Sequence, residues 1–291
     1  MADDAIYASR IFLNSALPLL KPLVEARPGL AKSFAGKSGV VQVSALLGPR
    51  AAEYEGLFGS AAPKADAAPA SAGPAKAAPA KAGTHFVVEE GCLRFAKGLH
   101  ASPDVELEFP SIEALNGFFS GKSKKLPAIK GALRSPGLLI ATFKSLLAMA
   151  SALGAKDAPE ADAERDLLAK LYFYLLSSGI SQLNKAGHPA VAKWARASPD
   201  RVYAWSVEGK PELSAYIRVK AGNTRAARGV YERSKPFFTM SFDSSKSALG
   251  ILLETDDMIE ATTASRIRML GAPEYGAMLG ELMLLVGSYA K

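Results

Sequence analysis

Hydrophobic positions near the end of the chain recur every three or four residues, whereas several earlier segments alternate apolar and polar positions. Between residues 275 and 289 the large apolar side chains share one wide helical face, which predicts a terminal helix opening at Pro273. Three glycines weaken this helix, so packing against other apolar residues has to hold it in place. The same spacing predicts helices over 6–34, 111–119, 136–153, 167–195, 247–253 and 256–265.

The alternating or β-branched segments predict strands between these helices. In the first half they lie at 40–46, 85–88, 93–96 and 105–109, and in the second half at 202–207, 213–220, 226–231 and 237–242. Pro18 and Pro22 are expected to break or kink the first helix, because proline lacks the backbone N–H that a helix needs. The order of elements predicts an α+β fold with small, mainly antiparallel sheets covered by helices.

One segment departs sharply from the composition around it. The 24 residues from Ser60 to Gly83 contain 12 alanines and 4 prolines. Alanine favours helix, but the prolines recur too closely for a helix to continue. The segment is therefore expected to be an exposed, disordered insertion.

The two halves of the chain repeat the same order of motifs. Residues 28–32 resemble 189–193 at an offset of 161 (189 − 28), and 105–109 match 238–242 at an offset of 133 (242 − 109). The first copy is thus longer by 28 residues (161 − 133), and the alanine/proline insertion supplies most of them. The pattern predicts a duplication with units at 1–155 and 156–291.

Composition places the chain among globular proteins, because 49% of its 291 residues are hydrophobic and 22% are charged. Its single cysteine, Cys92, excludes an intramolecular disulfide, which fits a reducing compartment. The acidic start of the chain disfavours a secretory leader, and no uninterrupted apolar run has the length of a membrane span. These features together predict a cytoplasmic protein.

Residues that carry catalysis or bind metals do not form a recognisable pattern. His85, His100 and His188 are far apart in the sequence, which disfavours a metal site. Residues 117–123 resemble a phosphate-binding loop, but they have three residues between the glycines where that loop needs four. The chain is therefore expected not to be an enzyme and to carry no cofactor or metal.

The formal net charge of +7 favours anionic partners, and basic residues concentrate between positions 218 and 235. This run has two open interpretations, a solvated sheet face and a surface that binds anionic membranes. Nucleic acid is disfavoured, because only Tyr216 and Tyr231 could stack on bases there. The residues expected at a membrane surface are Arg218, Lys220, Arg225 and Arg228.

The second half resembles the sterol carrier protein family of lipid-transfer domains. The resemblance rests on the strand ending Thr239-Met240-Ser241-Phe242 and on the segment 267–275 that leads into the last apolar helix. The first half, from Phe109 to Leu147, looks like a more diverged copy. Together the two cover most of the chain, although the motifs are short and hydrophobic.

The resemblance implies two sterol-carrier-like units, in which sheet and helices enclose an apolar tunnel without catalytic residues. It implies binding of a lipid such as a sterol, a fatty acyl chain or a phospholipid, with transfer between membranes as an open extension. The residues expected to line the tunnel are Ile217, Phe238, Met240, Phe242, Met269, Tyr275, Met278, Leu279, Leu282, Met283 and Val286, with Phe109, Phe143 and Leu147 in the first half.

Two other functions stay open at this point, an interaction or scaffolding protein without a cavity and an enzyme acting on a lipidic or acyl-CoA substrate. For the terminal helix, we expect Tyr275–Leu279 to pack as core and Leu282–Tyr289 to be able to open as a lid. The pattern leaves undecided which lipid is bound, which half binds it, and the oligomeric state.

Overall fold

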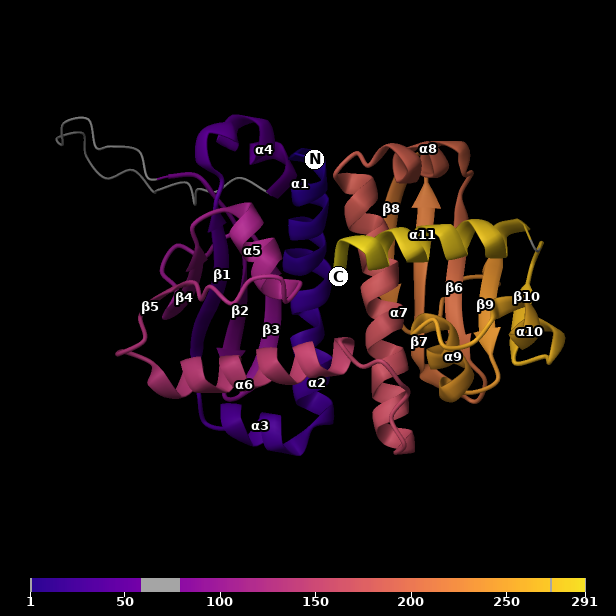
Figure 1. Ribbon diagram of the computed structural model, residues 1–291, viewed down its shortest axis with the longest axis horizontal. Coiled ribbons are helices and arrows are strands. Elements are labelled where there is room, and N and C mark those ends of the chain that lie inside the picture. The colour runs from indigo at the N-terminus through magenta and orange to yellow at the C-terminus, as the bar shows by residue number, and fades with distance from the viewer. Residues whose placement is uncertain (1, 59–78, 273, 291) are drawn as a thin grey trace.

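Two five-stranded sheets, each flanked by helices, form the protein, as Figure 1 shows. This is a computed structural model, and it describes residues 2–58, 79–272 and 274–290. The expected α+β class is confirmed, since both sheets mix one parallel pairing with antiparallel ones.

The first half contains α1 (Ala2–Ile11), η1 (Phe12–Ala16), η2 (Leu17–Leu19), α2 (Leu20–Ala26), α3 (Pro28–Phe34), β1 (Gly39–Leu46), η3 (Gly48–Arg50), α4 (Ala51–Phe58), β2 (Lys81–Glu89), β3 (Cys92–Lys97), β4 (Val105–Phe109), α5 (Ile112–Phe119), β5 (Ala128–Lys130) and α6 (Pro136–Leu153). The second half contains α7 (Asp162–Lys185), α8 (Pro189–Ala197), β6 (Arg201–Val207), β7 (Lys210–Lys220), β8 (Asn223–Arg228), β9 (Phe238–Phe242), α9 (Ser245–Leu252), α10 (Met258–Thr263), β10 (Ile267–Leu270) and α11 (Glu274–Ala290).

The two sheets have the same topology. Their strand orders are β3-β2-β1-β4-β5 and β8-β7-β6-β9-β10, and in each the central pair, β1–β4 or β6–β9, is parallel. Residues 40–46 therefore share a sheet with residues 105–109, as the duplication requires. The register also matches positions between the halves: Val41 pairs with Val105, and Tyr203 pairs with Phe238.

Helices join the two halves at the centre of the molecule. The rod formed by α1, η1, η2 and α2 packs along α7, so the first long helix of each half contacts the other (Figure 1). Helix α6 crosses the first half and reaches α7, while α11 crosses the second half and reaches α1. The two ends of the described chain also meet, because the Tyr289 hydroxyl donates a hydrogen bond to Asp4 Oδ1 at 2.8 Å.

Several local predictions need correction. The α geometry of the first helix is interrupted around Pro18, as predicted, since the π-helix η1 and then the 3₁₀-helix η2 separate α1 from α2. The predicted helix 6–34 does not reach its expected end, because α2 ends at Ala26 and residues 28–34 form the separate helix α3. The predicted helix 167–195 is two helices, α7 and α8. The short strands β5 and β10 were not predicted, because three or four residues carry little periodicity.

The predicted insertion is shorter than the composition suggested. Residues 81–83 belong to β2 and pair with β1, and the Leu47 N–H donates a hydrogen bond to the Ala80 carbonyl at 2.9 Å. The disorder prediction is therefore wrong at this end of the segment. Residues 60–78 of the predicted insertion lie outside the described residues.

Candidate functional site

The lipid-lining residues predicted in the second half come together in one packed core. Ile217, Phe238, Met240 and Phe242 are fully buried on the face of the sheet that α7 and α11 cover. Four predicted residues of α11 are buried as well, while three others at this edge are only partly buried. The buried four are Leu279, Leu282, Met283 and Val286, and the partly buried three are Met269, Tyr275 and Met278.

Helix α11 makes two especially close contacts, one near each end. Val286 lies so close to Gly179 of α7 that a Cβ there would be 2.5 Å from Val286 Cγ1. Near the other end, a Cβ at Gly276 would be 2.4 Å from Met269 Sδ. Gly179 and Gly276 therefore allow close packing, and the structure describes α11 in this packed arrangement, which leaves the expected opening of Leu282–Tyr289 a prediction.

The three residues predicted in the first half do not share one environment. Phe109 is fully buried against Phe118 and Phe119, with ring centroids 5.3 Å and 6.0 Å away. Phe143 of α6 is partly buried against the core, whereas the side chain of Leu147 is 69% exposed on the outside of the same helix. Leu147 thus faces solvent rather than an interior chamber.

Matching the two sheets by register shows that their interior faces are filled differently. Where the first half has Val41 and Val43, the second has Tyr203 and Trp205. The parallel neighbours differ in the same direction, since Val105 and Leu107 correspond to Phe238 and Met240. At these four positions the interior of the second half is filled by larger side chains. Trp205 also donates a hydrogen bond from Nε1 to Met283 Sδ at 3.2 Å.

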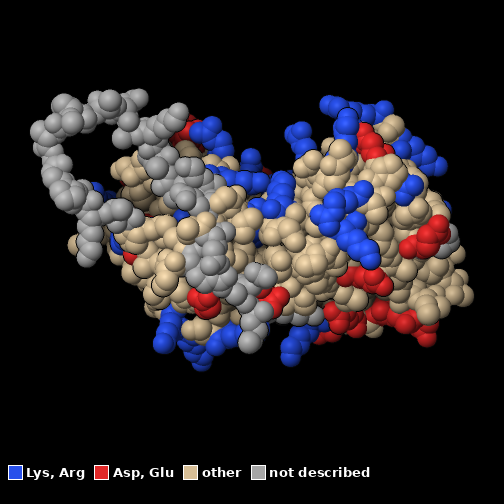
Figure 2. Space-filling model, turned by 90° about the horizontal axis from the view of Figure 1, so that it is seen from above, with Lys and Arg blue, Asp and Glu red and all other residues tan. Residues whose placement is uncertain are grey.

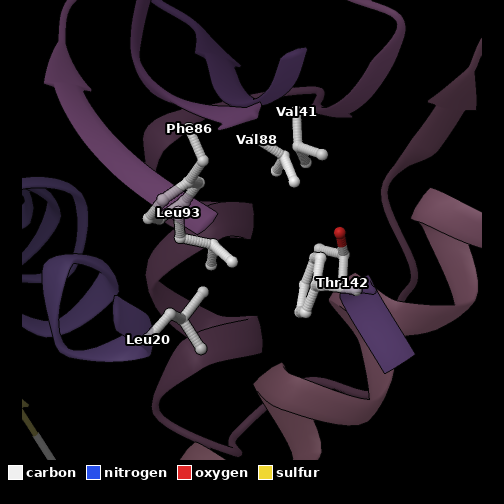
Figure 3. Close-up of a pocket in the computed structure, with 7 residues that line it drawn as sticks. Leu20, Val41, Phe86, Val88, Leu93 and Thr142 are labelled. Atoms are coloured by element: carbon white, nitrogen blue, oxygen red, sulfur yellow. The ribbon is translucent and has the colours of Figure 1, made fainter. Parts of the chain in front are cut away.

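The smaller side chains of the first half leave a hollow between its sheet and helices α2, α3 and α6 (Figure 3). Its volume is about 10 Å³, enough for about one water molecule. The Thr142 hydroxyl is used within α6, donating to the Leu138 carbonyl at 2.8 Å, so the wall is effectively apolar. The lining residues are Leu20, Phe34, Val41, Phe86, Val88, Leu93 and Thr142.

A larger hollow of about 230 Å³ lies at the other end of α6. Leu167, Leu168 and Leu171 of α7 line it together with Ser151 and Ala152 of α6. Arg27 and Glu164 also line it, and they form an ion pair of 2.6 Å. Helix α6 is therefore a wall of both hollows. Pockets that hold drug-sized ligands measure roughly 300–1,000 Å³, so a lipid fits here only if a wall moves.

The outer side of α6 is also apolar. Ile140 is 56% exposed and Leu147 is 69% exposed, while Leu133, just before the helix, is 99% exposed. Of the described helices, α6 alone is long and apolar enough to cross a membrane by length and composition, with a mean hydropathy of 1.5. Of this helix 33% is buried. Lys144 interrupts its apolar sequence, so α6 has this character by its mean hydropathy and not as an uninterrupted apolar run.

The segment that carries this apolar surface is also basic. The chain has no aspartate or glutamate between Glu113 and Asp157, and seven lysines and arginines lie in that interval. Among them Lys124, Lys125 and Lys144 are exposed. The acid-free stretch is the sequence signal for this surface, which the predicted membrane-surface residues of the second half do not include.

The four basic residues predicted at a membrane surface do not form one unpaired patch. Arg218 donates two hydrogen bonds to Asp200, at 2.9 Å and 2.6 Å, and Lys220 lies 3.9 Å from the same carboxylate. Arg228 points to the opposite sheet face, stacks 4.7 Å from the Tyr174 ring centroid and donates to the Pro18 carbonyl. Arg225 is exposed on the edge strand.

Within the described ranges, no three His, Cys, Asp or Glu side chains are grouped to hold a metal ion. His85 and His100 contact each other with ring centroids 5.3 Å apart. His188 lies between Tyr7 and Tyr289, with ring centroids 4.8 Å and 5.9 Å away. The three histidines thus occupy two separate places and pack against aromatic rings.

No protein-family model matches the chain, and no curated protein matches it. Among solved structures, it is similar to the stereoselective inverting sec-alkylsulfatase Pisa1 from Pseudomonas sp., at 11% sequence identity and a TM-score of 0.26. The similarity covers 59% of this chain and 30% of the alkylsulfatase, so this chain spans less than a third of that protein.

Proposed function

We propose that the first half binds a lipid with a long apolar chain beneath α6, and that α6 moves aside at a membrane to admit it. The observation that supports this is the placement of α6, which is apolar on both sides and forms a wall of both hollows. A helix needed only as core has no use for Ile140 and Leu147 on its outer side.

The outer side of α6 has the chemistry of a membrane-surface helix. Burying an exposed apolar side chain of this size contributes about 1.5–3 kcal/mol, and Ile140, Leu147 and Leu133 are available for it. Each lysine or arginine near an anionic membrane adds about 1 kcal/mol. Together these terms favour α6 lying on the membrane over α6 facing water.

Moving α6 would expose the apolar interior of the first half, and a lipid chain could cover it again. An 18-carbon chain has roughly 14 kcal/mol available in gross transfer terms, much of which is needed to leave the bilayer. The hinge would be at Gly131 and Gly154, which flank the segment. Gly131 has φ +75° and lies directly against the Asp104 carbonyl, which anchors the segment to the sheet. Because the cost of leaving the bilayer offsets much of the transfer free energy, the net affinity for the lipid would be modest, as exchange with a membrane requires.

The proposal is tested by the double variant Ile140→Gln/Leu147→Gln, which removes exposed apolar surface and no core contact. Lipid released from the purified chain is identified by mass spectrometry, and binding to phosphatidylcholine vesicles with and without phosphatidylglycerol is measured by sedimentation. The matched control is Leu284→Gln, because Leu284 is 62% exposed on the corresponding helix α11.

We expect the double variant to lose vesicle binding and to take up less than a tenth as much fluorescent fatty acid. The reason is that two apolar side chains, exposed in the free protein, can no longer be buried in the membrane. The control should behave like the unchanged protein. Absence of any bound lipid, or equal losses in the double variant and the control, would exclude this function.

A further inference from the structure

Four basic side chains from both halves lie close enough to repel one another at the seam between them, Lys97 with Arg10, and Lys185 with Arg10, Lys97 and Arg225. They come from α1 (Arg10), β3 (Lys97), α7 (Lys185) and β8 (Arg225), and β3 and β8 are the sheet edges nearest the middle of the molecule (Figure 1). Figure 2 shows lysine and arginine side chains where the two halves meet. The cluster lies away from the hollows that border α6, whose lining includes none of these residues.

Arg10 lies at the base of this cluster and is only 7% exposed. Its Nη2 donates a hydrogen bond to Gln182 Oε1 at 2.8 Å, and its guanidinium lies 5.8 Å from the Phe58 ring centroid. Its Nε is buried and has no hydrogen-bond partner. A buried charge with an unused donor is costly unless an oppositely charged group completes its contacts.

No carboxylate of the described residues neutralises the cluster. Among the described residues, none of the four basic side chains lies within ion-pair distance of an aspartate or glutamate, in contrast to Lys81 and Lys210, which have such partners. Burial lowers the pKa of Arg10 to about 10. Burial, and then repulsion from Lys97, Arg10 and Arg225, also lower the pKa of Lys185.

We propose that this seam binds a phosphate group, with Arg10 at its base and Lys97, Lys185 and Arg225 around its rim. A phosphate monoester carries about 1.5–2 negative charges and three strong acceptor oxygens, which suits several cations better than a single carboxylate does. The unused Nε can join in a forked contact to two oxygens, the geometry that arginine favours with oxyanions. The phosphate could belong to a phospholipid headgroup or to a free phosphate compound, and both supply this chemistry.

The direct test is calorimetric titration of the full chain with inorganic phosphate. The double variant Lys97→Gln/Lys185→Gln removes two exposed rim charges, and Lys32→Gln/Lys193→Gln removes two exposed charges elsewhere as its matched control. We expect the rim variant to bind roughly tenfold more weakly or worse, because charge-assisted contacts are lost, and the control to bind as the unchanged chain does. Both variants leave Arg10 and the core untouched, so they should stay folded.

A second arm distinguishes the two sources of phosphate. Vesicles of phosphatidylcholine with phosphatidic acid are compared with vesicles of phosphatidylcholine alone, with inorganic phosphate as competitor. Binding that needs phosphatidic acid, weakens in the rim variant and is competed by phosphate supports a headgroup. Phosphate binding that depends on the rim, without such vesicle binding, supports a free phosphate compound.

The proposal is overturned if inorganic phosphate does not bind, or if the rim variant and its control bind it equally. Because phosphate binding is measured without any lipid, failure of lipid uptake under α6 leaves this result unaffected. Arg10→Gln serves as a further check, and a folded Arg10→Gln chain that keeps full phosphate affinity would also contradict the site.

Discussion

The two halves share one topology but fill it in opposite ways. Sheet order and pairing are the same, yet the positions of Val41 and Val43 in the first half correspond by register to Tyr203 and Trp205 in the second. On the central parallel strands the larger side chains belong to the second half, whereas on the neighbouring strand Phe86 of the first half corresponds to Ile217. The comparison teaches that one topology can be filled by different distributions of large side chains, and under the function proposed above the first half would be the copy that admits a ligand.

The covering helices differ in the same direction. Helix α11 inserts Val286 against Gly179 and exposes one large apolar side chain, Leu284, among its described residues. Helix α6 exposes two, Ile140 and Leu147. The buried share of the two helices is similar, with 6 buried residues among the 18 of α6 and 5 among the 17 of α11, so they differ in the apolar residues that they expose.

The comparison predicts its largest effect for Trp205→Ala, which should lower the free energy of unfolding by about 3–5 kcal/mol, since a fully buried aromatic leaves a cavity. Val43→Ala at the matching position of the first half should cost about 2 kcal/mol, because fewer methyl groups are removed. Urea unfolding monitored by circular dichroism measures both. Equal losses would mean that the two interiors are packed alike.

A smaller effect on stability, with a large effect on binding, is expected for Val41→Phe. The added ring would occupy the hollow under α6 and strain the core by about 1–3 kcal/mol. Uptake of a fluorescent fatty acid should fall at least tenfold. As a control, Ile217→Phe enlarges a fully buried strand residue of the second half, and it should destabilise to a similar degree without affecting uptake. A reversed outcome would move the lipid site to the second half.

The smallest effect is expected for the carboxylate of Glu106, a sheet position at which only the first half carries a charge. Glu106 Oε1 accepts hydrogen bonds from Ser44 at 2.6 Å, Lys81 at 2.9 Å and Gln42 at 2.9 Å. Burial by itself raises the pKa of Glu106, but these hydrogen bonds bring it below its ordinary value of 4.5. The matching position in the second sheet is Thr239, which does not titrate.

Since the folded pKa lies below the unfolded one, this carboxylate stabilises the first half above about pH 4.5, and that stability is lost as the pH falls through the folded pKa. The first half should therefore weaken first on acidification, by roughly 1–2 kcal/mol. Glu106→Gln should flatten the pH dependence of urea unfolding between pH 5 and pH 3, about the range over which glutamate titrates. An unchanged slope would remove Glu106 as its cause.

Much of the architecture could be predicted from the sequence, because the pattern that encodes it is local. The bounds of β4 and α6 were predicted to the residue, Ser111 caps α5 by accepting from the Ala114 N–H, and the repeated order of motifs matches the repeated sheet. The acid-free composition around α6 was also present in the sequence. Helical and strand periodicity, capping and composition are properties of neighbouring residues, so they need no tertiary partner to be recognised.

Only the tertiary structure decided which apolar residues became core and which stayed exposed. The apolar spacing of α6 puts Leu146 inside and Leu147 outside, and the sequence alone does not reveal which partner covers either. The sequence alone likewise does not reveal that Arg10, Lys97 and Lys185 lie near one another. Lys97 follows Arg10 by 87 residues (97 − 10), and Lys185 follows Lys97 by 88 (185 − 97). Burial and electrostatic repulsion depend on the packing of distant segments. The seam therefore exists only where the two halves pack together, and the hollow under α6 only where α6 packs onto its own sheet.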